Sequence, residues 1–183
     1  MSFDQSNQIK KIIRTIPDYP KKGIQFRDIT SLLEHPWAFR NCLSKLETEA
    51  VLFDTDIVVG IESRGFIFGA PVADALLKPF IIARKAGKLP NETVSKKFKL
   101  EYGNEELHIQ KLSPLKGNIV IIDDLIATGG TALTCADLIH ENWDIPKENI
   151  TVMAIINLPD LKGSAIIKDN GYKVYTYLDF DDE

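Results

Sequence analysis

Apolar residues recur along this chain in two alternating patterns. Short apolar runs rich in β-branched residues predict buried strands at residues 56–60, 80–83, 119–122, 151–156 and 173–178. Helical spacing of apolar residues predicts helices over residues 1–15, 37–48, 66–77 and 132–141, with Pro17 and Pro20 ending the first. Strands that alternate with helices favour an α/β fold with a mainly parallel central sheet flanked by helices.

Residues 84–117 break this alternation, because they contain no long apolar run and are rich in Lys, Glu and Gly. Residues 94–100 and 105–111 can pair as two antiparallel strands around a Gly-Asn turn. A long polar excursion between two core strands is uncommon unless it is functional. We therefore expect a small antiparallel hood, or flexible lid, within a single domain that spans residues 1–183.

Composition narrows the class of protein. A hydrophobic content of 44% and a charged content of 26% are those of a soluble globular protein. The net charge of −4 argues against a nucleic-acid partner. A membrane-spanning helix needs about 18 consecutive apolar residues, and no apolar run in this chain approaches that length. Two cysteines, Cys42 and Cys135, lack metal-ligand spacing and fit a reducing compartment. We expect a cytoplasmic protein.

The most informative segment is residues 120–131, which read Val-Ile-Ile-Asp-Asp-Leu-Ile-Ala-Thr-Gly-Gly-Thr. Backbone N–H groups at Gly129 and Gly130, together with the positive end of the following helix, can bind a phosphate. Asp123 and Asp124 end the apolar run, where they can accept hydrogen bonds from the two hydroxyls of a ribose. A Walker A loop and a dinucleotide-binding glycine motif are both absent from this segment.

Two further segments place cations where an anion could bind. Residues 60–66 connect a core strand to a helix, so their amides face the edge where open α/β sheets bind ligands. Arg64 in this loop can neutralise a diphosphate. Arg84, Lys85 and Lys88 follow the next strand, and both residue types suit phosphates.

Taken together, these segments resemble a known family of enzymes. Residues 120–131 are similar to the signature that binds phosphoribosyl diphosphate (PRPP) in type I phosphoribosyltransferases. Five segments, at residues 19–33, 60–71, 84–90, 100–103 and 123–131, follow the order typical of the adenine phosphoribosyltransferases. The resemblance covers residues 8–160 and implies the type I phosphoribosyltransferase fold.

The resemblance also implies a role for each segment. The 5′-phosphate and ribose are expected at Asp123, Asp124, Ala127, Thr128, Gly129, Gly130 and Thr131. The diphosphate is expected at Ser63, Arg64, Arg84, Lys85 and Lys88. Adenine is expected at Gln25, Phe26, Arg27 and Leu125, with Phe26 and Leu125 on its two faces and backbone groups reading its edge. Glu101 and Tyr102 belong to the hood, and the expected catalytic residues are Glu101 and Arg64.

The implied reaction is adenine plus PRPP giving AMP and diphosphate, a purine-salvage step. Mg²⁺ is the implied cofactor, held mainly by PRPP oxygens, with Asp123 and Asp124 acting indirectly. The resemblance further implies a homodimer whose interface lies beside residues 63–73 and 84–89. It also implies a cis peptide bond between Glu62 and Ser63 that directs an amide at the ligand.

Two alternative functions share these features. The first is a phosphoribosyltransferase for xanthine, orotate or hypoxanthine, although oxopurine enzymes commonly read the 6-oxo group with a lysine or aspartate. The second is a PRPP-sensing regulator that binds nucleic acid. Such regulators usually carry an extra helical domain or a basic face, and this short acidic chain shows neither.

Overall fold

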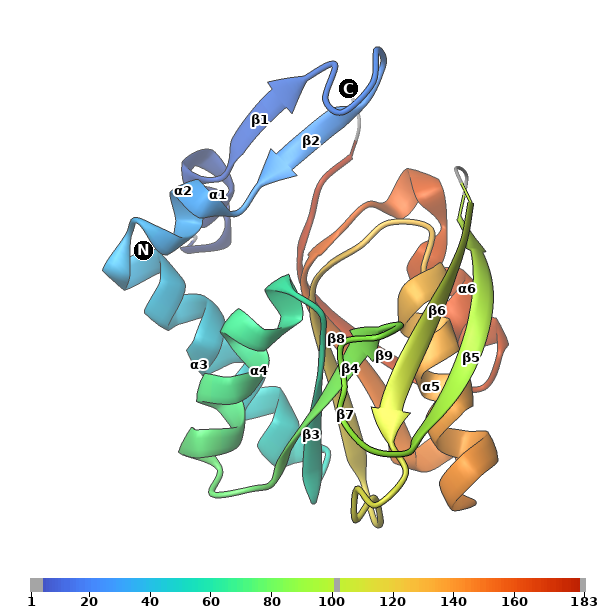
Figure 1. Ribbon diagram of the computed structural model, residues 1–183. Helices are drawn as coiled ribbons and strands as arrows, with labels where there is room; N and C mark the ends of the chain where they lie inside the picture. Colours follow the sequence, from blue (N-terminus) through green and yellow to red (C-terminus); the bar gives the residue numbers. More distant parts are fainter. Residues whose placement is uncertain (1–4, 101–102, 182–183) are drawn as a thin grey trace.

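The computed structural model describes residues 5–100 and 103–181, and its centre is a twisted seven-stranded sheet (Figure 1). The strand order is β5-β6-β4-β3-β7-β8-β9. These strands are β3 (Ile57–Ile61), β4 (Phe80–Lys85), β5 (Thr93–Leu100), β6 (Gly103–Gln110), β7 (Ile119–Ile126), β8 (Ile150–Asn157) and β9 (Lys173–Asp179). The neighbours from β4 to β9 pair in parallel, and the β5–β6 hairpin is antiparallel.

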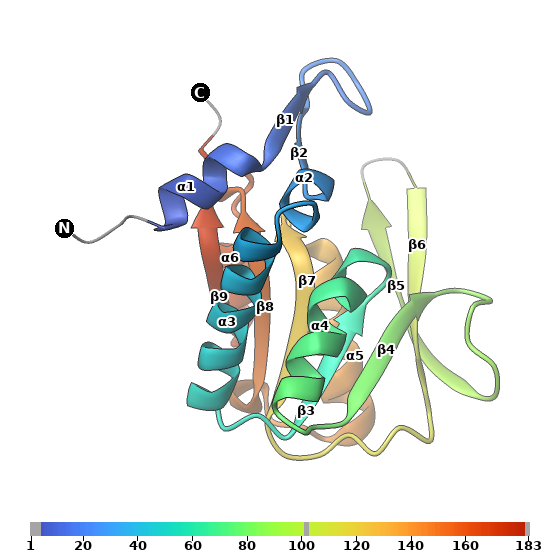
Figure 2. The same cartoon turned by 90° about the vertical axis from the view of Figure 1, so that its left-hand side faces the viewer.

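Helices cover both faces of this sheet, as Figures 1 and 2 show. On one face lie α1 (Gln5–Ile12), α2 (Thr30–Leu33), α3 (Pro36–Leu52) and α4 (Arg64–Ala75). On the other lie α5 (Gly130–Trp143) and α6 (Gly163–Asp169), with short 3₁₀ turns η1 (Lys147–Asn149) and η2 (Pro159–Leu161). The expected α/β fold is confirmed. Among the described residues, no helix combines the length and apolar character needed to cross a membrane.

Burial explains why the central strands read as continuous apolar runs. Every residue of β3 and β8 is buried. Side chains alternate between the faces, so Val58 and Val120 pack under α3 and α4, whereas Val59 and Ile121 pack under α5. Parallel strands covered by helices on both sides need apolar residues at successive positions.

The predicted N-terminal helix is too long, because α1 ends at Ile12. Arg14–Pro17 instead forms β1, which pairs antiparallel with β2 (Gln25–Asp28) in a separate two-stranded sheet. Ile9 and Ile13 are buried, but Ile16 is 39% exposed and does not continue their core face. Pro17 also disfavours helical geometry at the residue before it. Figures 1 and 2 show this N-terminal sheet projecting beyond the ends of the central strands.

The polar excursion forms the predicted hairpin, with β5 paired to β6. The predicted turn is misplaced, because Gly103 and Asn104 lie within β6 and pair with Leu100 and Lys99. The hairpin is also continuous with the central sheet, because β6 pairs with the end of β4 at Arg84 and Lys85. Leu107 and Ile109 are buried in the core. On β5, Lys96 forms ion pairs with Asp137, at 3.3 Å, and with Glu141 of α5. These contacts fasten the hairpin to the helix that begins at the Gly-Gly loop.

Candidate active site

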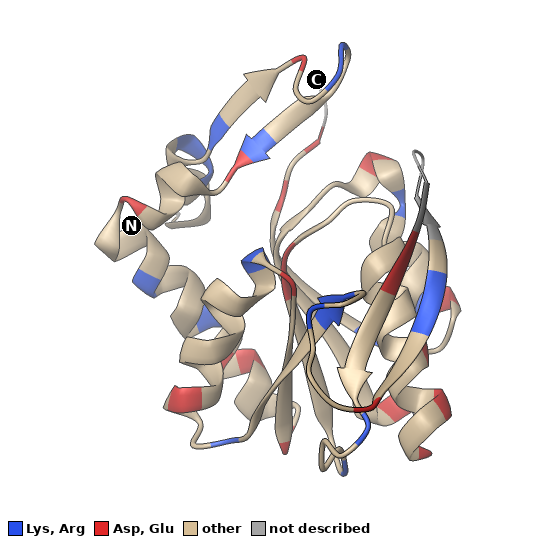
Figure 3. Cartoon of the chain, viewed as in Figure 1, with Lys and Arg blue, Asp and Glu red and all other residues tan. Residues whose placement is uncertain are grey.

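Two loops meet where the parallel strands end. One connects β3 to α4, and the other connects β7 to α5. Between them lies a cleft of about 320 Å³. Its lining comprises Glu62, Ser63, Arg64, Lys85, Glu105 and residues 123–132. The structure therefore brings most of the residues expected to bind PRPP into one cleft, although Arg84 and Lys88 are not among its lining residues. Figure 3 shows acidic and basic segments close together at the ends of β3, β4 and β7.

The Gly-Gly loop has the geometry of an anion-binding helix terminus. Gly129 is left-handed, with φ +79°, and α5 begins at Gly130. A Cβ at Gly129 would lie 2.7 Å from the carbonyl oxygen of Gly163, so both the conformation and the close approach require glycine. Thr128 and Thr131 also line the cleft. The first N–H groups of α5 can therefore bind an anion there, assisted by the helix dipole.

Asp123 and Asp124 lie within β7, which runs to Ile126 and is longer than the apolar run predicted. Asp124 is 2% exposed, and its Oδ2 lies 3.1 Å from Nε of Arg64. This contact is an ion pair without a hydrogen bond, so the buried Oδ2 can still accept one. The Asp124 amide donates to Oδ1 of Asp123 at 2.9 Å.

Burial raises the pKa of both carboxyl groups. The negative charge of Asp124 raises the pKa of Asp123 further, whereas Arg64 opposes the rise at Asp124. The ion pair therefore favours the charged form of Asp124, the form that accepts hydrogen bonds from hydroxyl groups.

The residues expected at the base divide between two faces of β2. Phe26 lines a second cleft, of about 310 Å³, together with Tyr19 and Arg64. Its ring lies edge-on to Tyr19, at 5.1 Å, and the Arg64 guanidinium lies 5.7 Å from its centre. Because Arg64 also lines the first cleft, the two clefts adjoin. Leu125 lines the first cleft from the side of β7.

The side chains of Gln25 and Arg27 lie on the opposite face of β2, since strand side chains alternate. They line a different cleft, where the Arg27 guanidinium stacks 4.8 Å from the ring centre of Phe180. At these two positions, only the main chain remains available to a base that lies beside Phe26.

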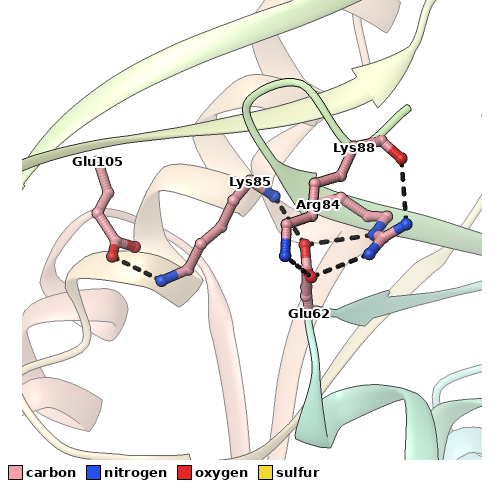
Figure 4. Close-up of polar contacts among 5 residues, drawn as sticks. All are labelled: Glu62, Arg84, Lys85, Lys88 and Glu105. Atoms are coloured by element: carbon pink, nitrogen blue, oxygen red, sulfur yellow. Dashed lines mark hydrogen bonds and ion pairs between the residues drawn. The ribbon is translucent and has the colours of Figure 1, made fainter. Parts of the chain in front are cut away.

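Glu62 lines the cleft but is not among the site residues expected from the sequence (Figure 4). Arg84 donates to its carboxylate through Nη2 at 3.0 Å and Nε at 3.3 Å. Nζ of Lys88 and the amide of Lys85 donate to it at 3.1 and 3.0 Å. The hydrogen bonds from Arg84, chief among these contacts, lower the Glu62 pKa to about 2. Two of the cations expected at the diphosphate, Arg84 and Lys88, are thus paired with one carboxylate.

The Lys85 side chain has a separate partner. Its Nζ donates to Glu105 of β6 at 2.6 Å, so it joins β4 to the hairpin at the rim of the first cleft (Figure 4). The peptide bond between Glu62 and Ser63 is cis, as the resemblance implies. Glu101 and Tyr102 lie outside the described residues.

Comparison with known proteins identifies the family. Residues 31–165 match the phosphoribosyl transferase domain. An adenine phosphoribosyltransferase from Chlorobium luteolum is 48% identical over 181 residues, covering 96% of this chain and 99% of that protein. The chain belongs to the adenine phosphoribosyltransferase family.

Solved structures of this family share the fold. The adenine phosphoribosyltransferase of Thermoanaerobacter pseudethanolicus is 40% identical, with a TM-score of 0.86 over 95% of this chain and 99% of that one. The Giardia lamblia enzyme, complexed with 9-deazaadenine, is 32% identical, with a TM-score of 0.89 over 96% of this chain and 97% of that one. The resemblance inferred from the motifs is therefore confirmed.

Proposed function

We propose that this adenine phosphoribosyltransferase transfers phosphoribose from PRPP to adenine, giving AMP and diphosphate in purine salvage. The observation that carries the proposal is the cleft that joins a helix-terminus anion site, the half-buried Asp123, the buried Asp124 and Arg64, beside a second cleft that contains Phe26. The names of the relatives described above support adenine as the base.

The sugar phosphate fits the side of the cleft formed by β7 and α5. The 5′-phosphate accepts hydrogen bonds from the amides of the Gly-Gly loop and from the hydroxyls of Thr128 and Thr131. Asp123 and Asp124 accept hydrogen bonds from the ribose hydroxyls. Asp124 suits this role because its buried Oδ2 already faces a cation and can still accept a hydrogen bond.

The diphosphate fits the opposite side, between Ser63–Arg64 and the cations at and just beyond the end of β4, which are Arg84, Lys85 and Lys88. In the reaction, the bond between C1 of the ribose and the diphosphate oxygen breaks, and the electron pair leaves with the diphosphate. N9 of adenine then bonds to C1, and its proton is released. Catalysis is mainly positioning and charge stabilisation, because C1 develops positive charge while the leaving group gains negative charge.

The base fits between Phe26 and Leu125, with main-chain groups of β2 at its edge. Glu101 is assigned by resemblance to the N7 side of adenine. A protonated Glu101 there would stabilise the negative charge that the ring gains as N9 loses its proton. Closure of the hairpin over the site would exclude water, which otherwise hydrolyses the activated sugar.

Mg²⁺ is the proposed cofactor. The donor set fits, because two carboxylates line the cleft and Asp124 keeps an unused acceptor, but the described residues contain no group of three or more side chains that could hold a metal alone. Such a set suits an ion bound mainly through the substrate's oxygens. When bound, the ion would neutralise part of the diphosphate charge.

A homodimer in the cytoplasm is the proposed state of the protein. The proposed interface lies beside residues 63–73 and 84–89, and within the first segment Phe68 is buried in the core and Phe66 packs edge-on against Phe80. The cationic residues 84–89 remain the stronger candidates for contact with a partner. Sedimentation of a species at the chain mass of 20.6 kDa, at assay concentrations, would rule the dimer out.

Titration calorimetry with nucleotide products tests the base assignment without turnover, since no diphosphate is present. We expect AMP to bind more tightly than GMP, IMP, XMP and OMP. Equal or tighter binding of an oxopurine nucleotide or OMP would favour a transferase for that base. Binding of PRPP with no binding of any nucleotide product would favour a PRPP-sensing regulator.

A further inference from the structure

Asn157 is a buried polar residue outside the PRPP signature. It is the last residue of β8, is 8% exposed, and pairs in register with Ile126, directly before the Gly-Gly loop. After Asn157, the chain remains close to β7, because the amide of Leu158 donates to the carbonyl oxygen of Ile126 at 3.0 Å. Asn157 therefore lies beside the start of the proposed 5′-phosphate loop, residues 127–131.

Both ends of the Asn157 amide are hydrogen bonded. Its Nδ2 donates to Asp179 at 2.7 Å, and its Oδ1 accepts from the Ser164 hydroxyl at 2.7 Å. A carboxylate can only accept, so Asp179 fixes which way the amide points. The oxygen is thereby directed at Ser164, the second residue of α6. The main-chain carbonyl oxygen of Asn157 also accepts a hydrogen bond from the main-chain amide of Phe180, at 2.9 Å.

The residue before Ser164 supports the phosphate loop through main-chain contact. A Cβ built on Gly163 would lie 2.2 Å from the carbonyl oxygen of Ala127 and 2.6 Å from the nitrogen of Gly129. In the other direction, a Cβ on Gly129 would meet the Gly163 carbonyl. The loop and Gly163 are thus packed backbone against backbone, with no room for a side chain between them.

We infer that Asn157 is a positioning residue for the 5′-phosphate loop, acting through Ser164 to hold Gly163 against residues 127–129. The inference rests on the proposed binding of PRPP at that loop. A hydrogen bond weakens steeply as the donor N–H turns away from its acceptor, so displacing the support would weaken the bonds from the loop amides to the anion. The Asn157–Ser164 hydrogen bond keeps that support in place.

Loss of the Asn157–Ser164 hydrogen bond is expected to change KM for PRPP and not KM for adenine. Loss of one buried hydrogen bond in the support is expected to raise KM for PRPP about five- to tenfold, with kcat and KM for adenine within about twofold. Adenine is a separate readout because its proposed contacts, Phe26 and Leu125, do not depend on Gly163. A residue that only stabilised the fold would lower Tm and leave the ratio of the two KM values unchanged.

The test compares three variants by steady-state kinetics and thermal unfolding. Asn157→Ala and Ser164→Ala each remove the proposed bond. Tyr172→Phe is the control, since it removes a bond of equal length, 2.7 Å to Asp137, from a residue that is 3% exposed just before β9 begins. We expect all three to lower Tm, and only the first two to raise KM for PRPP.

Each result decides between a positioning and a structural role. An unchanged KM for PRPP in Ser164→Ala overturns the inference, whether or not Asn157→Ala can be purified. A rise of similar size in Tyr172→Phe overturns it as well, because the effect would then follow from general destabilisation. Failure of the proposed function is a separate result, seen as a wild-type protein that forms no AMP at all.

Discussion

At the scale of single residues, the site consists of carboxylates and cationic side chains that form ion pairs with one another. Asp124 fixes Arg64 at the junction of the two clefts, and Glu62 gathers Arg84 and Lys88 beside the diphosphate loop. Each carboxylate is paired with a cation that the proposed reaction uses. A substitution at either acid therefore changes the position of a cation as well as the charge of the site.

Replacing Asp124 with Asn is expected to weaken productive binding of PRPP. The change removes the negative charge that accepts from a ribose hydroxyl and attracts Arg64, so we expect KM for PRPP to rise about tenfold or more. Steady-state kinetics with varied PRPP measures the effect. An unchanged KM for PRPP would show that the Asp124 carboxylate does not meet the sugar.

Replacing Glu62 with Gln tests the cation cluster through its pH dependence. A carboxylate with a depressed pKa adds stability above its unfolded pKa and loses it as pH falls through the folded pKa. For Glu62 that window runs from pH 4.5 to about 2. The stability advantage of wild type over Glu62→Gln should shrink across this window, as measured by urea unfolding. A constant difference between the two proteins would contradict the ion-pair account.

Comparing wild type with Glu62→Gln also separates the pH dependence of stability due to Glu62 from the opposite pH dependence due to Asp123 and Asp124. The folded-state pKa values of Asp123 and Asp124 are raised by burial, so protonation relieves the cost of burying them and their effect on folding becomes more favourable as pH falls. These residues are identical in wild type and Glu62→Gln. The difference between the two unfolding curves therefore isolates Glu62.

Replacing Glu101 with Leu is expected to act on kcat. General acid–base groups typically contribute about 10²–10⁴-fold, and a contact made only in the transition state appears in kcat. We expect a loss in that range, with little change in KM for PRPP, because Glu101 is assigned to the base. Near-full kcat with adenine would remove the acid role and leave Glu101 as part of a solvent-exposed hood.

At the scale of elements, the strand-and-helix alternation could be predicted because periodic burial leaves a periodic sequence. The signal failed where no such period exists. β1 and β2 form a small exposed pair, so Arg14–Pro17 has no buried residue to mark it as a strand. The pairing of β5 with β6 was predicted, although the Gly-Asn pair expected at the turn lies within β6. The attachment of the hairpin to β4 was not predicted, because that contact is long-range.

Glycine contacts between elements give a prediction at this scale. Gly65 of α4 lies against β7, and a Cβ there would be 2.4 Å from the carbonyl oxygen of Ile122, whereas a Cβ on Gly130 would meet only Thr128, at 4.0 Å. Gly65→Ala should therefore lower the free energy of unfolding by about 1–3 kcal/mol, as overpacking does. Gly130→Ala, the matched control, should change it by less than about 1 kcal/mol. Equal effects in urea unfolding would contradict the packing argument.

At the scale of the whole molecule, the site collects segments from across the chain at one end of the sheet. The Gly-Gly loop, the loop after β3 and Phe26 are contiguous motifs, so the sequence could identify them. Glu62 and Asn157 could not be identified from the sequence. Their roles depend on contacts with residues that are distant along the chain, and those contacts leave no local sequence pattern. The motifs predict which residues bind the substrates, and the structure shows which other residues keep those binding residues in position.

The central claim is that this cleft joins PRPP to adenine. The most direct test is AMP formation by the purified chain with PRPP and Mg²⁺, with adenine, guanine, hypoxanthine and xanthine compared at equal concentrations. We predict PRPP-dependent turnover with adenine, and kcat/KM for each oxopurine lower by about 10³-fold or more, since buried base-reading groups are left unpaired by the wrong ring edge. Turnover of an oxopurine at the adenine rate, or no product from any base, would contradict the account.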